Sequence, residues 1–157
     1  MMAQEIRPLT RTLQAPAPEA SPAPVPVALY GLGAIGIEVA KAALARTGIR
    51  VVAAVDVDPA KVGQDLGTLC GVKPCCVIVH AGAQDLGGAK VVVHTTGSFL
   101  ADVGPQLFAL LERGVRVVSS TEELAYPRLR HPDLARKLDA AARQNGVALV
   151  GVGVNPG

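Results

Sequence analysis

The sequence has little of what marks several large classes of protein. It has no tryptophan, and aromatic residues make up only 3% of its 157 residues, so alanine and valine must supply most of the packing, which suits an α/β core. Its formal net charge of +2 comes from scattered residues, without the basic stripe and interleaved aromatics of a nucleic-acid-binding surface. No apolar run reaches the length of a membrane span, and the N-terminus lacks the layout of a signal peptide. We therefore expect a cytoplasmic protein that binds neither nucleic acid nor a membrane.

Cysteine is also scarce. The three cysteines, Cys70, Cys75 and Cys76, match no Cys-x-x-Cys zinc or redox motif, and no histidine lies at ligand spacing beside them. The histidines His80 and His94 lie in or directly after apolar stretches. We therefore expect ordinary reduced thiols and no metal site.

The rest of the composition divides the chain into two parts. The first part, residues 1–24, is rich in proline and alanine toward its end. This composition forms neither a helix nor a central strand, so we expect a disordered tail. Residues 25–157 alternate between apolar stretches and helical patterns, which predicts a single domain. The expected strands lie near 27–30, 51–56, 76–79, 90–95, 115–119 and 147–152. The expected helices lie near 34–46, 103–113 and 131–144.

This alternation predicts the fold class. Strands that alternate with helices form a parallel sheet through right-handed crossovers. The expected fold is therefore α/β, a Rossmann-type doubly wound parallel sheet of about six strands in the order 3-2-1-4-5-6. Proline supports two of the helix positions, because Pro105 and Pro132 are expected in the first turns of the second and third helices.

The strongest motif is a glycine-rich turn between the first strand and the first helix. Gly31 lets the chain turn sharply, Gly33 lets a pyrophosphate approach the backbone, and Gly36 lets the helix pack closely on the strand. The free N–H groups and the dipole of the first helical turn favour a phosphate group. The residues expected to bind a dinucleotide in this turn are Gly31, Leu32, Gly33, Ala34, Ile35 and Gly36.

An acidic residue follows at the spacing typical of such a turn. Asp56 comes twenty residues after Gly36, at the end of the second strand, where it can accept hydrogen bonds from an adenosine ribose. Its charge would repel a 2′-phosphate, Asp58 adds to that repulsion, and Lys61 offsets it. The expected cofactor is NAD or NADP, with a preference for NAD. The alternative is a tight strand–turn–helix that binds no ligand.

Polar residues follow the fourth strand, whose tip should lie beside the glycine turn at the topological switch point. Their hydroxyl groups can hydrogen-bond the ribose or phosphate of the cofactor, and the glycine among them permits a close approach. These candidate residues are Thr95, Thr96, Gly97 and Ser98. A second interpretation makes Ser98 the cap of the following helix, and the two roles are compatible.

Two adjacent carboxylates, Glu122 and Glu123, follow the fifth strand and face the crevice near the expected nicotinamide. A carboxylate there can hold an ammonium or iminium group or move a proton. Ser120 and Glu123 have the spacing of a capping box, in which Glu123 bonds the Ser120 N–H, so Glu122 is the better candidate for a substrate contact. After the sixth strand, Asn155 can hydrogen-bond the nicotinamide carboxamide or form part of a turn.

Together these segments resemble the N-terminal domain of the dihydrodipicolinate reductase-like superfamily, and within it 2,4-diaminopentanoate dehydrogenase and the native amine dehydrogenases. The narrowest signals are Ser-Thr-Glu-Glu-Leu-Ala-Tyr-Pro and Gly-Val-Asn-Pro-Gly. The resemblance implies NAD(P)-dependent oxidation of an amine or reductive amination of a ketone. It also implies that one glutamate of the pair contacts the reacting amine. The segments that carry it are 31–36, 55–67, 95–98, 120–127 and 153–157.

In that family a second domain supplies most of the substrate pocket and the dimer contacts, whereas this sequence stops at Gly157. We expect a cofactor-binding half that is inactive alone, with homo-oligomers possible in a longer form. Two alternatives stay open. One is a non-catalytic nucleotide-sensing or interaction domain. The other is a different two-domain dehydrogenase, such as homoserine dehydrogenase or a sugar oxidoreductase, although the latter group usually has Glu-Lys-Pro where this chain has Thr-Glu-Glu-Leu.

Overall fold

The computed structural model describes residues 22–153, in which strands alternate with helices. Most of the expected tail, residues 1–21, and Asn155 lie outside the described residues. The strands are β1 (Val25–Tyr30), β2 (Ile49–Val55), β3 (Val79–His80), β4 (Val91–His94), β5 (Arg116–Ser119) and β6 (Leu149–Gly151). The helices are α1 (Ala34–Leu44), α2 (Leu66–Leu69), α3 (Leu100–Glu112), the 3-10 helix η1 (Glu122–Ala125), α4 (Pro127–Arg130) and α5 (Pro132–Gln144).

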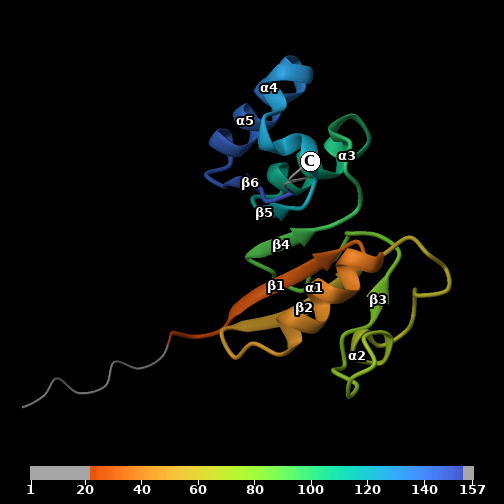
Figure 1. Ribbon diagram of the computed structural model, residues 1–157. Helices are drawn as coiled ribbons and strands as arrows, with labels where there is room; N and C mark the ends of the chain where they lie inside the picture. Colours follow the sequence, from red (N-terminus) through yellow and green to blue (C-terminus); the bar gives the residue numbers. More distant parts are fainter. Residues whose placement is uncertain (1–21, 154–157) are drawn as a thin grey trace, which may run out of the picture.

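All strands run parallel in the order β3-β2-β1-β4-β5-β6, which confirms the expected Rossmann-type sheet (Figure 1). The switch point lies between β1 and β4, because the chain adds strands on one side of β1 and then on the other. Tyr30 pairs with His94 across β1 and β4, and His94 pairs with Ser119 across β4 and β5. The carboxyl ends of these three strands therefore meet at one edge of the sheet.

Helices cover both faces of the sheet, as expected for strands without polar alternation. Successive residues of a strand point to opposite faces and so enter two separate cores. On one face Ala28 packs in a core with Leu107 of α3 and Leu138 of α5, and on the other Leu29 packs in a core with Ala40 of α1. Figure 1 shows α1 lying across β1 and β2. Within residues 22–153, no helix combines the length and hydrophobicity of a membrane span.

The third strand differs from the prediction. The sequence predicts a strand over 76–79, but β3 spans only Val79–His80. Cys76 has a φ of 61°, a left-handed conformation that an extended strand excludes. Ile78 then forms an isolated antiparallel bridge with Asp65. The chain therefore joins the edge of the sheet only after these residues.

Helix α3 begins at Leu100 and not, as the sequence predicts, near residue 103. Pro105 consequently lies inside the helix and not in its first turn. Because proline has no backbone N–H, one hydrogen bond of the helix is missing at this position. The earlier start is stabilised by Glu123, whose carboxylate accepts the Leu100 N–H at 2.8 Å. This partner comes from η1, which follows β5, and cannot be found in the local sequence. Pro132 opens α5 as predicted.

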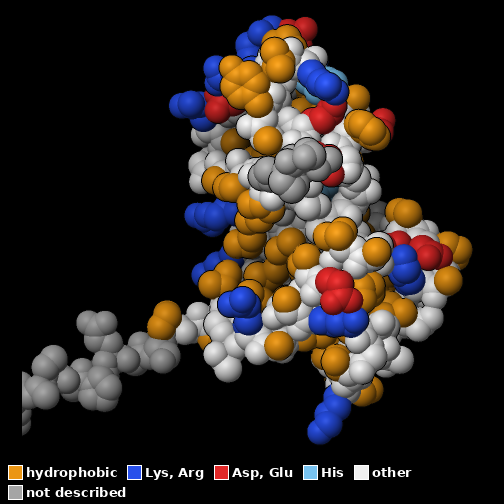
Figure 2. Space-filling view, viewed as in Figure 1, with side chains coloured by type: hydrophobic (Ala, Val, Ile, Leu, Met, Phe, Trp, Pro, Cys, Tyr) orange, Lys and Arg blue, Asp and Glu red, His pale blue; other side chains and the backbone are white. Residues whose placement is uncertain are grey.

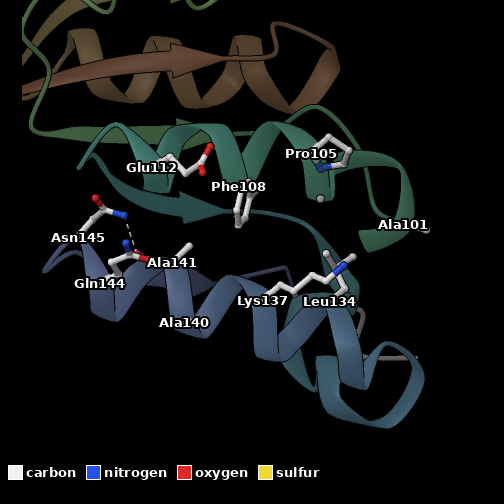
Figure 3. A pocket seen from close by; sticks show the side chains of 11 residues that line it. Ala101, Pro105, Phe108, Glu112, Leu134, Lys137, Ala140, Ala141, Gln144 and Asn145 are labelled. Atoms are coloured by element: carbon white, nitrogen blue, oxygen red, sulfur yellow. Dashed lines mark hydrogen bonds between the residues drawn. The ribbon is translucent and has the colours of Figure 1, made fainter.

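The largest of the described hollows is a groove of about 870 Å³ between α3 and α5, and all its lining residues belong to these helices or to the C-cap of α5. Phe108 of α3 and Leu134 and Lys137 of α5 line it (Figure 3). The helices can approach closely because α3 carries Gly104, where a Cβ would lie 2.9 Å from a methyl carbon of Leu134. This α3–α5 groove is therefore distinct from the edge where the strand tips meet.

We predict that Leu107→Ala lowers the free energy of unfolding by about 2–5 kcal/mol, because it opens a cavity in the core under α3. Leu107 is fully buried, at 0% exposure. Leu129→Ala, at a position that is 75% exposed, is the matched control and should change the free energy by less than about 0.5 kcal/mol. Urea denaturation followed by circular dichroism measures both. Equal losses in the two variants would contradict the assignment of the core.

Candidate functional site

The glycine turn between β1 and α1 passes against the tip of β4. Gly31 has a φ of 97°, and a Cβ on it would lie 2.7 Å from the backbone carbonyl of Thr95. A Cβ on Gly36 would lie 2.0 Å from the Gly31 carbonyl oxygen. These distances leave no room for a side chain, so the fold itself requires both glycines.

Gly33 has a different position in the same turn. Its φ of −66° is accessible to any residue, and a Cβ on it would meet no atom within 4 Å. The fold therefore does not require a glycine here. Gly33 is the N-cap of α1, and no side chain caps the N–H groups of the first helical turn. Those N–H groups have no partner within the helix, so the turn has the arrangement that binds an anion.

Asp56 is buried at the end of β2, and both of its carboxylate oxygens accept backbone hydrogen bonds. Oδ2 accepts the N–H of Leu32 in the glycine turn at 2.6 Å, and Oδ1 accepts the N–H of Asp58 at 2.8 Å. Asp56 thus fastens the glycine turn to β2, a role that its spacing alone does not reveal. A carboxylate has about four acceptor positions, so Asp56 retains capacity for a ligand on the side that faces the cleft.

Two clefts flank the glycine turn and share Gly33, Thr95 and Thr96. The smaller cleft, of about 320 Å³, is also lined by Tyr30, Gly31, Asp56, Val57, Lys61 and Gln106. The larger cleft, of about 430 Å³, is also lined by Ala34, Ile35, Gly97, Ser98, Ser120, Glu122, Val152 and Gly153. Most of the predicted site residues therefore come together. The described candidates that line neither cleft are Leu32, Gly36 and Glu123.

Three residues that line the smaller cleft were not identified from the sequence. Tyr30 is the last residue of β1, and Val57 follows the end of β2 by two positions, so their places at strand tips are a signal that could have found them. Gln106 comes from α3, and no local pattern marks it. It is held near the cleft by the hydroxyl of Thr96, which donates to its Oε1 at 2.8 Å.

The hydroxyl groups after β4 are partly engaged within the protein. Thr95 Oγ1 donates to the Gly31 carbonyl at 2.7 Å and so holds the glycine turn against β4. The interpretation of Ser98 as a helix cap is wrong, because the N-cap of α3 is the next residue, Phe99, whose own side chain makes no cap hydrogen bond. Ser98 instead lines the larger cleft.

A buried chain of hydrogen bonds joins the tips of β4 and β5 beneath the clefts. His94 is fully buried, and its ring nitrogens lie 3.0 Å from Ser119 Oγ and 3.0 Å from Gln106 Oε1. Ser119 Oγ donates to Thr121 Oγ1 at 2.9 Å, and Thr121 Oγ1 donates to the Gly97 carbonyl at 2.8 Å. Burial lowers the pKa of His94, so the imidazole is neutral at neutral pH. The chain ties the loop after β4 to the loop after β5.

Glu122 and Glu123 have different surroundings. Glu123 Oε2 accepts the Leu100 N–H at 2.8 Å and lies 2.9 Å from His131 Nε2, and these contacts, led by the Leu100 N–H, lower the pKa of Glu123. The predicted capping box is wrong, because the Ser120 N–H donates to the last carbonyl of β4. Glu122 is exposed and lines the larger cleft. The chain therefore presents one glutamate of the pair to the cleft and uses the other to hold α3.

No protein-family model matches the sequence. The chain is 33% identical over 142 residues to 2,4-diaminopentanoate dehydrogenase of Acetoanaerobium sticklandii, with 85% of this chain and 39% of that protein covered. The structure of amine dehydrogenase from Mycobacterium smegmatis matches with a TM-score of 0.76 and 34% identity, over 81% of this chain and 38% of that one. GenD2 from gentamicin A biosynthesis, in complex with NAD, matches with a TM-score of 0.61 and 26% identity, over 88% and 37%.

The chain is similar to part of an amine dehydrogenase. This bears out the resemblance that the sequence segments indicate, and with it the Rossmann-type fold. The matched region makes up 37–39% of the length of each of these relatives, so the chain spans about two fifths of them.

We predict that Glu123 makes stability depend on pH in the acid range. Its pKa is lowered in the fold from the ordinary value of 4.5, so its stabilisation is present above that value and is lost as the pH falls through the lower, folded value. Glu123→Gln should therefore melt at a lower temperature at neutral pH and lose less on acidification to about pH 3. Thermal melts at several pH values measure this.

Glu112→Gln is the control for this prediction, because Glu112 is exposed. It should leave both the melting temperature and its pH profile as in the unaltered chain. A Glu123→Gln profile parallel to that of the unaltered chain would contradict the assigned role.

Proposed function

We propose that this chain binds a nicotinamide dinucleotide across the two clefts and is the cofactor-binding part of an oxidoreductase that acts on a CH–NH₂ group. The observation that carries the proposal is the empty Cβ position of Gly33, at the uncapped N-terminus of α1 and between the two clefts. The fold does not require a glycine at position 33, but a side chain there would keep a ligand away from the backbone. A glycine at this position therefore suits a ligand that must approach the backbone closely. The similarity to amine dehydrogenases supports the class of reaction.

The two clefts suit the two halves of the cofactor. The pyrophosphate would lie on the first turn of α1, where N–H groups and the helix dipole face an anion. The adenosine half would enter the smaller cleft, where Asp56 can accept from ribose hydroxyls. The nicotinamide half would enter the larger cleft, beside Ser98 and Glu122. The predicted carboxamide contact of Asn155 stays part of this proposal.

Glu122 is our candidate for the contact with the reacting amine. An amine that gives up a hydride must first be deprotonated, so a carboxylate can hold its ammonium form and accept the proton. The cofactor supplies the hydride acceptor when bound. Glu123 already accepts the Leu100 N–H and contacts His131, so it would act by positioning the η1 turn that carries Glu122.

We propose that the activity needs more protein than this chain, because the chain spans only about two fifths of its relatives. A substrate domain would complete the pocket for a small amine or ketone, and a homo-oligomer would form only in that longer protein. A second candidate is a non-catalytic nucleotide-sensing domain, in which Glu122 would have no role. A cytoplasmic location, which the sequence predicts, remains part of the proposal.

We predict that Gly33→Ala weakens NADH binding by at least about tenfold, because its Cβ would occupy the space of the pyrophosphate. Gly48→Ala is a matched control: its Cβ also meets nothing within 4 Å, but Gly48 lies outside both clefts. Both variants should melt within a few degrees of the unaltered chain. Titration of NADH fluorescence gives the affinities. Equal affinities in the two variants, or no binding of NADH by the unaltered chain, would overturn the cofactor site.

We predict that Glu122→Gln lowers kcat for amine oxidation by about 100-fold or more, because the amine loses its proton acceptor. The assay joins this chain to the part of 2,4-diaminopentanoate dehydrogenase that it does not match and follows NADH formation with 2,4-diaminopentanoate. Glu38→Gln, on an exposed position of α1, should leave the rate unchanged. Full activity with Glu122→Gln would refute the amine contact. A nucleotide sensor would instead give no amine-dependent NADH with any of these chains.

A further inference from the structure

A side-chain hydrogen bond joins the two segments that line the larger cleft. Gly97 and Ser98 come from the loop after β4. Ser120 and Glu122 come from the segment after β5. Thr121, which lies between these last two, donates its hydroxyl hydrogen to the Gly97 carbonyl at 2.8 Å. Thr121 is fully buried and lines neither cleft, so this bond lies behind the cleft wall.

The other contacts of the η1 turn lie elsewhere or are long. Between residues 95–98 and 120–123, the described backbone makes one hydrogen bond, from the Glu123 N–H to the Ser98 carbonyl, at 3.4 Å. On the other side of the turn, Glu123 lies 2.9 Å from His131 Nε2 and 3.5 Å from Arg130 Nη1. Figure 2 shows acidic, basic and histidine side chains close together near α4. Thr121 therefore supplies the short contact between the two segments.

The hydrogens of the buried chain behind Thr121 can run in only one direction. The Gly97 carbonyl can only accept, so it takes the hydroxyl hydrogen of Thr121. Ser119 Oγ, 2.9 Å from Thr121 Oγ1, must then donate to it, and also accepts the Thr121 N–H at 3.2 Å. Because a hydroxyl has a single hydrogen, the 3.0 Å contact of Ser119 with His94 requires the hydrogen on His94 Nδ1.

The second ring nitrogen of His94 suits this tautomer. Burial lowers the pKa of His94, which favours a neutral ring with a lone pair on Nε2. Nε2 lies 2.9 Å from Thr96 Oγ1, and it shares the hydroxyl hydrogen of Thr96 with Gln106 Oε1, which is 2.8 Å from the same oxygen. One hydrogen on the ring is therefore enough to orient the chain as far as Gly97.

We propose that Thr121 is a positioning residue for the larger cleft: its hydrogen bond to the Gly97 carbonyl, oriented by the Nδ1–H of His94, holds the two segments at the separation that the nicotinamide half of a dinucleotide needs. This inference rests on the proposed cofactor site and assigns how one half of that site keeps its shape. Thr121 would act through Gly97 and Glu122 and not by contact with the ligand. A cleft that is already formed binds more tightly, because less free energy is spent on ordering it.

Thr121→Val removes the hydroxyl, keeps a side chain of similar shape and leaves the Gly97 carbonyl without its donor. The dissociation constant of NADH should rise by about tenfold, because its nicotinamide half meets a cleft that is no longer held in shape. ADP carries the adenosine and the pyrophosphate but no nicotinamide, so its dissociation constant should change by less than about twofold. Thr121→Ser restores the hydroxyl and should bring the affinity for NADH back to within about threefold of the unaltered chain.

Calorimetric titrations of each chain with NADH and with ADP measure these constants. Thr68→Val, on an exposed position of α2 outside both clefts, is the matched control and should change neither. Loss of NADH affinity alone in Thr121→Val, with recovery in Thr121→Ser, supports the assignment. Equal changes for both ligands, no change for either, or a serine variant no better than the valine variant overturns it.

The unaltered chain separates failure of this inference from failure of the cofactor site. If it binds ADP as tightly as NADH, the nicotinamide half makes no contact in the larger cleft, and the role of Thr121 is overturned while the site for the adenosine half stands. If it binds neither ligand, the proposed cofactor site itself fails, and the assignment that depends on it falls as well.

The direction of the hydrogens can be tested without any ligand. Proton–nitrogen spectra of the imidazole rings in the ¹⁵N-labelled chain show which nitrogen of His94 carries the hydrogen. We expect a neutral ring with the hydrogen on Nδ1. A neutral ring with the hydrogen on Nε2 would reverse the chain at Ser119 and overturn the assignment.

Discussion

The structure of this site depends on a close approach of backbone segments at the carboxyl edge of the sheet. The glycine turn passes so near the tip of β4 that neither Gly31 nor Gly36 has room for a side chain. Thr95 Oγ1 donates to the Gly31 carbonyl and closes this contact with a hydrogen bond. The approach brings the start of α1 against the switch point, and the uncapped first turn of the helix lines the larger cleft. Gly33 is the one glycine of the turn that the packing does not explain.

Carboxylates hold the loops around this edge in place. Asp56 accepts the Leu32 N–H from the glycine turn, and Glu123 accepts the Leu100 N–H at the start of α3. Asp65, the N-cap of α2, accepts the N–H of Thr68 within that helix and the N–H of Cys75 after it. A buried or half-buried N–H is costly without an acceptor, so these acids stabilise loop conformations that no regular ladder supports. Glu122, in contrast, lines the larger cleft.

The sequence allowed the sheet order and the glycine turn to be predicted because their signals are local: apolar stretches, helical spacing and glycines at fixed offsets. The errors arise where a partner is distant along the chain. The start of α3 depends on Glu123, which is 23 residues from Leu100, and local patterns therefore placed the helix three residues too late. The contact of Asp56 with the glycine turn was missed for the same reason, since Leu32 lies 24 residues away. Gln106 reaches the cleft only through tertiary packing.

The central claim is that a dinucleotide binds against the glycine turn and not in the larger α3–α5 groove. Amide spectra of the ¹⁵N-labelled chain, recorded during a titration with NADH, test it most directly. The account predicts that the amide signals of Gly33, Ala34 and Ser98 shift together along one saturating curve, while those of Phe108 and Lys137 stay in place. Shifts confined to Phe108 and Lys137, or none up to millimolar NADH, would contradict it.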